Sequence, residues 1–209
     1  MTFKKKVKEY WNKFWFMLWK DDSLKGWIFS VVFLFIFIKL IFFPLLTLVT
    51  GTPLPLAIVE SCSMYHEGNF FSNFNNWWTS QEEKYSDFEI EKSNFSDFKF
   101  RKGFNKGDIL FIVGTPASRL KVGDVIVFQA EGRNPIIHRI MEINENSDGT
   151  RTFATMGDNN FGQLSIEKSI EENTIVGRAV FRLAPYIGWV KLIFFEPAKA
   201  ASERGFCHS

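Results

Sequence analysis

The sequence predicts a mainly β fold: an antiparallel β domain, in the form of a partly open barrel or sandwich, that follows an N-terminal transmembrane helix. Three observations predict it. Near its N-terminus the chain contains one long apolar run. From residue 109 onward, short runs rich in Val, Ile and Phe alternate with Gly, Pro, Asn and Asp, which is typical of strands and turns. No apolar pattern of ordinary helix length competes with these runs in the predicted β domain.

The composition excludes several classes of protein. The 209 residues carry a net charge of +2, which gives no reason to expect a nucleic-acid partner. The two cysteines, Cys62 and Cys207, are too few for a disulfide scaffold or a four-cysteine zinc site. We therefore expect neither a metal nor a cofactor.

The long apolar run, residues 27–49, predicts a membrane span. As a helix, its 23 residues extend about 35 Å, and the hydrocarbon core of a bilayer is about 30 Å thick. The run is longer than the apolar core of a cleavable signal peptide, and no small-x-small cleavage site follows it. Lys39, near its middle, has no explanation in the sequence, and Pro44 predicts a kink. We place the transmembrane helix at residues 27–50.

Residues 1–26 predict an amphipathic helix that lies on a membrane surface. Their apolar residues recur every three or four positions, with lysines between them. This segment holds seven lysines and three acidic residues, whereas residues 51–209 hold 17 basic and 20 acidic residues. Because an excess of basic residues marks the cytoplasmic side, we predict a single-pass protein of the cell membrane whose remaining domain is extracytoplasmic.

The β domain is expected over residues 51–182. Gly-Asp pairs, which are typical of turns, precede two of its strands. The predicted strands are residues 109–113, 125–128, 136–140, 152–156 and 174–181.

An aromatic-rich stretch, residues 69–106, lies within this domain. Its eleven aromatic residues argue against disorder. It either forms a cap, rests Trp77 and Trp78 at the outer membrane interface, or forms an extra packed lobe without functional contacts. Asn94 begins a short N-glycosylation pattern in this stretch.

Three side chains form a chemically complete set for serine chemistry. Ser63 follows a short apolar run, and in an extended chain Ser61 points to the same side while Cys62 points away, as a packed core residue would. His138 lies inside a predicted strand, and a hairpin-like return after the next strand can bring Asp158 near it. A hydroxyl nucleophile needs a base, and an imidazole needs an acceptor that fixes its tautomer.

Five stretches carry a family resemblance. They comprise Ser-Cys-Ser-Met at 61–64 after the single span, then residues 120–128, 136–140, 156–160 and 177–180. In this order they resemble the motif boxes of type I signal peptidases. Since His138 stands where the bacterial branch has a lysine, the chain is similar to the archaeal and endoplasmic-reticulum branch.

The resemblance implies a role for each site residue. Ser63 attacks the scissile carbonyl, His138 is the general base, and Asp158 orients or stabilises the imidazole. Ser61 matches the position whose hydroxyl contributes to the oxyanion hole, together with the Ser63 backbone N–H. Met64 matches a position that lines the cleft, although a structural role is about equally compatible with it.

Two departures from the family pattern bear on these roles. The family often has proline two residues after the motif methionine, where this chain has Tyr65-His66. Some relatives carry a second acid shortly after Gly-Asp-Asn, where this chain has Gly162-Gln163. This leaves Asp158 as the main candidate acid, with Asp124 a poor alternative.

The remaining candidates receive structural interpretations. His66 lies in a polar turn and is expected at the surface, and His208 lies in the C-terminal tail. Residues 185–195 are apolar but too short for a span. We therefore interpret residues 183–209 as an interfacial anchor followed by a tail.

The expected function is that of a membrane-anchored serine endopeptidase, a hydrolase that removes signal peptides from exported preproteins. Its expected partners are such preproteins, membrane lipid and the protein translocation channel. Two alternatives stay open: a peptidase for a narrow set of surface proteins, and an inactive, membrane-tethered β binding module.

Overall fold

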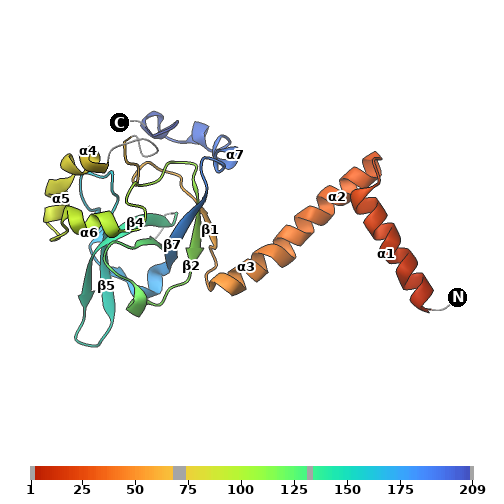
Figure 1. The fold of residues 1–209 in the computed structure, drawn as a ribbon, viewed down its shortest axis with the longest axis horizontal. Coiled ribbons are helices and arrows are strands. Elements are labelled where there is room, and N and C mark those ends of the chain that lie inside the picture. Colours follow the sequence, from red (N-terminus) through yellow and green to blue (C-terminus); the bar gives the residue numbers. More distant parts are fainter. Residues whose placement is uncertain (1–2, 68–73, 131–133, 208–209) are drawn as a thin grey trace. The chain divides into compact units, whose positions relative to one another are not determined.

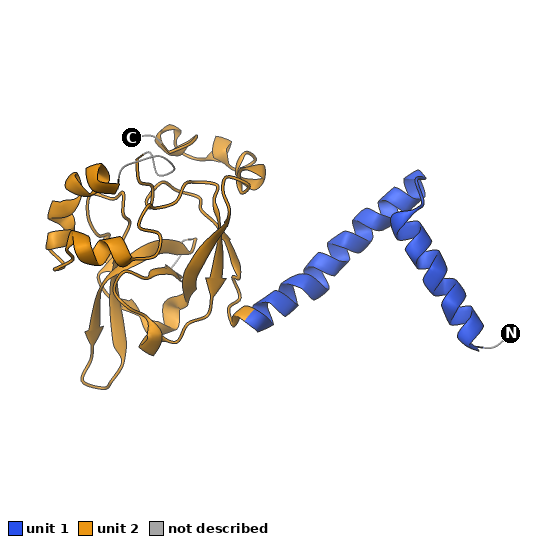
Figure 2. Cartoon of the chain, viewed as in Figure 1, with its two compact units in different colours: residues 1–49 blue, residues 50–209 orange. Residues whose placement is uncertain are grey.

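The computed structural model describes residues 3–67, 74–130 and 134–207. Phe70, Phe71 and His208 lie outside these described residues. The chain divides into two compact units, residues 1–49 and residues 50–209 (Figure 2). Each unit has its own internal packing, so we describe them separately.

The N-terminal unit is helical. It comprises α1 (Phe3–Trp19), α2 (Leu24–Phe37), a π-helical turn η1 (Ile38–Phe42) and α3 (Phe43–Thr50), of which the last residue belongs to the second unit. Ser23 caps α2, where its side chain accepts a hydrogen bond from the Gly26 N–H at 3.2 Å. Phe14 of α1 contacts Phe29 and Phe33 of α2, with ring centroids 5.7 and 5.3 Å apart.

The continuous apolar helix, Leu24–Thr50, has 27 residues and is long enough to cross a membrane. The structure confirms the predicted apolar helix of membrane-spanning length. Lys39 lies in the π-helical turn, where its Nζ is 5.8 Å from the centre of the Phe35 ring. The departure from regular α-helix therefore precedes Pro44, which lies at the start of α3.

The second unit is built on one antiparallel sheet of seven strands (Figure 1). The strands are β1 (Leu56–Ile58), β2 (Ile109–Val113), β3 (Val125–Phe128), β4 (Ile136–Glu145), β5 (Arg151–Met156), β6 (Ile170–Glu171) and β7 (Ile175–Ala184). Their order is β1-β2-β7-β3-β4-β5-β6. This arrangement confirms the predicted mainly β, antiparallel fold, although β4 and β7 extend beyond the predicted ends.

Short helices connect and flank the strands. The 3-10 turns are η2 (Ala117–Arg119), η3 (Ser165–Glu167), η4 (Glu172–Thr174), η5 (Glu196–Ala198) and η6 (Ala201–Glu203). The α-helices of this unit are α4 (Phe74–Thr79), α5 (Glu82–Ser86), α6 (Lys92–Asp97) and α7 (Trp189–Leu192).

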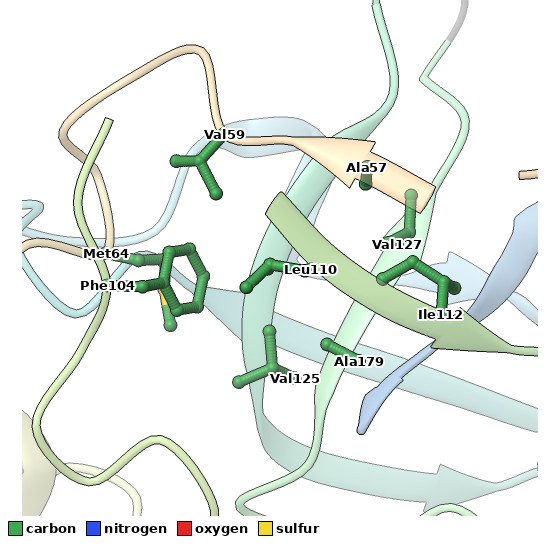
Figure 3. Close-up of a cluster of buried hydrophobic side chains, with 9 residues drawn as sticks. All are labelled: Ala57, Val59, Met64, Phe104, Leu110, Ile112, Val125, Val127 and Ala179. Carbon is green, nitrogen blue, oxygen red and sulfur yellow. The ribbon is translucent and has the colours of Figure 1, made fainter. Parts of the chain in front are cut away.

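One buried cluster joins the loop after β1 to the sheet. Figure 3 shows Met64 and Phe104 beside Leu110 of β2 and Val125 of β3. Met64 is 1% exposed, and the N–H of Phe104 donates to its carbonyl at 3.0 Å. The side chain of Met64 therefore packs in the core, which fits the structural alternative for this residue.

The aromatic stretch folds as a lobe beside β4 and β5 (Figure 1). We call helices α4, α5 and α6 together with Phe98 the aromatic lobe. Trp77 and Trp78 are 7% and 1% exposed, so the expectation that they rest at a membrane interface is wrong. They pack instead in a cluster that includes Met141 and Met156 of the sheet. This packing removes their apolar surface from water, which is favourable.

The C-terminal segment returns to the site region. Cys207 forms a disulfide with Cys62, although the sequence suggested a packed core cysteine at position 62. The two cysteines are 145 residues apart in the sequence, so only the tertiary fold brings them together. Near α7, the side chains of Ile187, Val190 and Phe194 are more than half exposed.

Candidate active site

Two hydroxyls lie side by side in the loop that follows β1. The Oγ atoms of Ser61 and Ser63 are 3.1 Å apart, which agrees with their predicted common side. The strand itself ends earlier, at Ile58, so a bend and a turn, and not an extended strand, place the two side chains. Ser61 is exposed and Ser63 is half-buried. Neither residue is buried.

The backbone on both sides of the Ser63 side chain is fixed by the turn after β5. The N–H of Asn159 donates to the carbonyl of Ser63 at 2.7 Å, and its side-chain amide donates to the carbonyl of Cys62 at 3.1 Å. The N–H of Asp158 contacts the Met64 sulfur at 3.4 Å. The Gly-Asp-Asn turn thus holds the serine loop in place.

His138 lies on β4, opposite Ile126 of β3, and is 4% exposed. Its Nδ1 is hydrogen-bonded to the carboxylate of Glu167. In a neutral imidazole, a carboxylate that accepts at Nδ1 places the ring proton on Nδ1, and the lone pair is then on Nε2. His138 is therefore held in the tautomer that a general base requires.

Neutral groups hold Glu167 in turn. The hydroxyl of Thr155 donates to its Oε1 at 3.0 Å, and the N–H of Leu164 donates to its Oε2 at 2.9 Å. The carboxylate is fully buried. Within the described ranges, its one ion pair is with His138. Its negative charge is thus directed at the imidazole.

Asp158 has different partners from the one that the sequence suggested. Arg139 donates to both of its oxygens, at 2.9 and 2.6 Å, and Tyr85 donates to Oδ1 at 2.9 Å. Burial alone would raise the pKa of Asp158, but the charge and hydrogen bonds of Arg139, together with His66, lower it below its ordinary value. The carboxylate is therefore ionised and already paired.

The alternation of a strand explains why Asp158 does not reach His138. His138 and Arg139 are consecutive residues of β4, so their side chains point to opposite faces of the sheet. Arg139 binds Asp158 on one face, and Glu167 of η3 binds His138 on the other. The hairpin return therefore places Asp158 beside Arg139, the residue after the predicted base, and not beside His138.

His66 is buried, which corrects the expectation that it lies at the surface. It is 1% exposed, its ring stacks on Trp77 at 3.6 Å, and its Nε2 is 2.9 Å from Asp158 Oδ2. Burial lowers the pKa of His66 and outweighs the opposing effect of Asp158. Local sequence patterns do not predict this burial, because the tryptophan that covers His66 belongs to the aromatic lobe.

The end of β5 links the loop of Ser63, the predicted nucleophile, to the strand that carries His138, the predicted base. Met156 of β5 is opposite Arg139, the neighbour of His138, and the turn that begins at the next residue contacts Ser63. Among the bonds of the described residues, none joins the Ser63 hydroxyl to His138. Catalytic hydrogen bonds are often formed only when substrate is bound, so this geometry is compatible with serine chemistry.

Sequence reasoning missed several groups of the site. Glu167 lies nine positions after Asp158, further along the chain than Gly162-Gln163, where some relatives carry a second acid. Lys84 and Tyr85 come from the aromatic lobe, which local sequence patterns do not connect to the site. Among the described residues, no group of three or more His, Cys, Asp or Glu side chains is placed to hold a metal ion.

No family model matches the chain. It is 36% identical over 102 residues to the human signal peptidase complex catalytic subunit SEC11C, and the match covers 46% of this chain and 53% of that protein. The dog SEC11C gives the same values. A yeast relative, SEC11 of Scheffersomyces stipitis, is 34% identical over 99 residues, which cover 44% of this chain and 58% of that protein.

These matches span about half the length of the relatives. They confirm the resemblance to the endoplasmic-reticulum branch of the type I signal peptidases. Homologues of this chain are thus the SEC11 catalytic subunits of the signal peptidase complex.

Proposed function

We propose that this chain is a membrane-anchored serine endopeptidase that cleaves signal peptides from exported preproteins. The observation that carries the proposal is the pair formed by His138 and Glu167, which leaves one imidazole nitrogen free at the end of the sheet that holds Ser63. The homology with signal peptidase catalytic subunits supplies the substrate class.

In the proposed reaction Ser63 Oγ attacks the scissile carbonyl while His138 Nε2 takes its proton. Glu167 stabilises the imidazolium that forms. The hydroxyl of Ser61 and the N–H of Ser63 stabilise the developing oxyanion. The C–N bond then breaks, and the imidazolium gives its proton to the leaving amine. Water, activated by the same imidazole, hydrolyses the acyl-enzyme and restores Ser63.

This proposal gives the two acids different roles. Glu167 orients the base, in the place that the sequence suggested for Asp158. Asp158 fixes the turn that contacts the serine loop, through its ion pair with Arg139. Both are positioning residues, since each acts through another group.

The proposed substrate binds in an extended conformation along a strand edge. β1 is an outer strand of the sheet and pairs only with β2 among the described strands. It leads through a short loop to Ser61 and Ser63. A peptide added to an edge strand gains backbone hydrogen bonds that do not depend on its sequence. This suits an enzyme that accepts many signal peptides.

One apolar helix and the homology indicate a single-pass membrane protein. We further propose that its N-terminus is cytoplasmic and that its β domain is on the extracytoplasmic side of the cell membrane. The disulfide between Cys62 and Cys207 supports this side, because disulfides persist in oxidising compartments. The exposed Ile187, Val190 and Phe194 are suited to contact lipid.

Further partners are proposed from the homologues. Their name places them in a complex, so we expect additional subunits for this chain. The translocation channel is a further expected partner, because a signal peptide must be cleaved where it leaves the channel.

The test is cleavage of a preprotein by the purified full-length chain in lipid vesicles. We expect one cut after the signal peptide, identified by mass spectrometry of the new N-terminus. Ser63→Ala should abolish it, whereas Ser118→Ala, a change at an exposed serine outside the site, should leave it unchanged. Cleavage that survives Ser63→Ala would exclude this serine as the nucleophile, and no cleavage by the parent chain would favour a binding module.

A further inference from the structure

The aromatic lobe covers the sheet, and two of its polar side chains also contact the Gly-Asp-Asn turn that holds the Ser63 loop. On α5, Lys84 Nζ donates to the backbone carbonyls of Asp158 and Asn160, the second at 3.1 Å. The next residue, Tyr85, donates to the Asp158 carboxylate. Two consecutive residues of the lobe therefore hold the backbone and the side chain of one turn.

The turn transmits this contact to Ser63. Between the two carbonyls that Lys84 binds lies Asn159, whose N–H donates to the Ser63 carbonyl at 2.7 Å. Only two hydrogen bonds thus separate the ammonium group from the backbone of the nucleophile. If the turn moves, the carbonyl of Ser63 loses its donor, and the serine loop becomes free to shift.

Tyr85, the residue that follows Lys84 on α5, is packed inside the lobe. Tyr85 is fully buried, and its ring lies 4.9 Å from Phe95 and 5.3 Å from Trp78. On the sheet side, the guanidinium of Arg139 lies 4.7 Å from the Phe95 ring. The lobe and the sheet therefore form one packed unit, from which Lys84 extends to the turn.

We propose that the aromatic lobe is a positioning element of the active site and that Lys84 is the positioning residue through which it fixes the Gly-Asp-Asn turn and, with it, Ser63. The proposal goes beyond the proposed cleavage reaction and rests on it. It replaces the expectation of a lobe without functional contacts.

The charge of Lys84 gives the proposal a pH signature. Burial lowers the pKa of Lys84 to about 8, against the attraction of Asp158. Among the described residues, the other charged or titratable groups that contact the turn are Arg139, His66 and Tyr85. Loss of the ammonium charge weakens its bonds to the carbonyls. Activity should therefore decline above about pH 8, and the decline should be absent in Lys84→Arg, since arginine stays charged.

The experiment compares Lys84→Met, Lys84→Arg and a matched control, Lys92→Met, at an exposed lysine of the same lobe. Each full-length variant is assayed in lipid vesicles for kcat and KM on a preprotein, and for hydrogen exchange of the peptide that contains Asn159. We expect Lys84→Met to lower kcat about tenfold, with KM within twofold, and to speed exchange at the turn. Lys84→Arg should restore most of kcat, and Lys92→Met should match the parent chain.

Each outcome decides the proposal. It is overturned if Lys84→Met retains kcat within twofold, if its loss appears in KM, or if exchange at the turn does not change. It is also overturned if the loss disappears at a temperature where the variant is fully folded, since that result shows a purely structural role. Failure of the parent chain to cleave, or cleavage by Ser63→Ala, would count against the proposed function and not against this contact.

Discussion

The second unit contains two buried pairs of a histidine and a carboxylate, and they differ in what else touches the carboxylate. Glu167 binds His138 and two neutral donors, whereas Asp158 binds His66, Arg139 and Tyr85. All four histidine and carboxylate side chains are almost fully buried. The same pair of functional groups is therefore placed in two electrostatic settings.

We propose that this difference determines which histidine acts as the base. A proton accepted by His66 would create a cation beside Arg139 and Lys84, and both oppose its protonation. The charge of Asp158 is already balanced by Arg139. Glu167 has no such partner among the described residues, so its charge is available to an imidazolium at His138. A histidine and an acid in contact are thus not sufficient, because the acid must also be free of another cation.

The largest effect should come from replacing each histidine. His138→Ala removes the proposed base and should lower kcat by on the order of 10⁴ or more, as in other serine–histidine systems. His66→Ala should retain the chemistry of the folded fraction while lowering the free energy of unfolding. Preprotein cleavage and thermal unfolding measure the two effects. If His66→Ala were the inactive, well-folded variant, the assignment of the base would be reversed.

The second largest effect should come from replacing the acid of the His138 pair. Glu167→Gln removes the charge that stabilises the imidazolium, and we expect a loss of about 10³ to 10⁴ in kcat, by analogy with the serine protease aspartate. Glu172→Gln, at an exposed acid five positions further along the chain, is the control. A loss of kcat below about tenfold would indicate that the reaction depends on Ser63 and His138 without a contribution from Glu167.

Asp158→Asn should act mainly on stability. It leaves the buried guanidinium of Arg139 without its ionic partner, and breaking a buried pair in this way costs about 3–5 kcal/mol. The free energy of unfolding, from denaturant titration, gives this number directly. The kcat of the fraction that remains folded should fall less than in Glu167→Gln. A larger loss of kcat in Asp158→Asn than in Glu167→Gln would favour Asp158 as the acid that orients the His138 imidazole.

The smallest effect should be the pH dependence of stability that His66 causes. Because burial lowers its pKa in the folded state, the unfolded chain binds a proton on this side chain more readily. The free energy of unfolding should therefore fall as the pH drops through the ordinary value of 6.5. Denaturant titrations from pH 7 to pH 5 should show this slope, and His66→Gln should flatten it. An equal slope in both proteins would contradict a buried, neutral His66.

The sequence by itself determined the architecture and the chemistry-bearing residues that local patterns encode. The length and composition of the run around Lys39 predict a membrane-spanning helix, because about 20 consecutive apolar residues in a helix match the thickness of the hydrocarbon core. Short β-branched and aromatic runs predict the strands, since alternation and turn residues are local signals. Motif order carried the family resemblance, and the homologues confirm it.

Only the tertiary structure decided the partners of those residues. Because side chains alternate along β4, His138 and Arg139 point to opposite faces of the sheet. Arg139 therefore pairs with Asp158, and His138 pairs with Glu167. The disulfide of Cys62 and the burial of His66 depend on segments that are far away in the sequence. A pattern within one segment reports that segment's conformation, whereas a charge pair depends on which distant segments the packing brings to the same face.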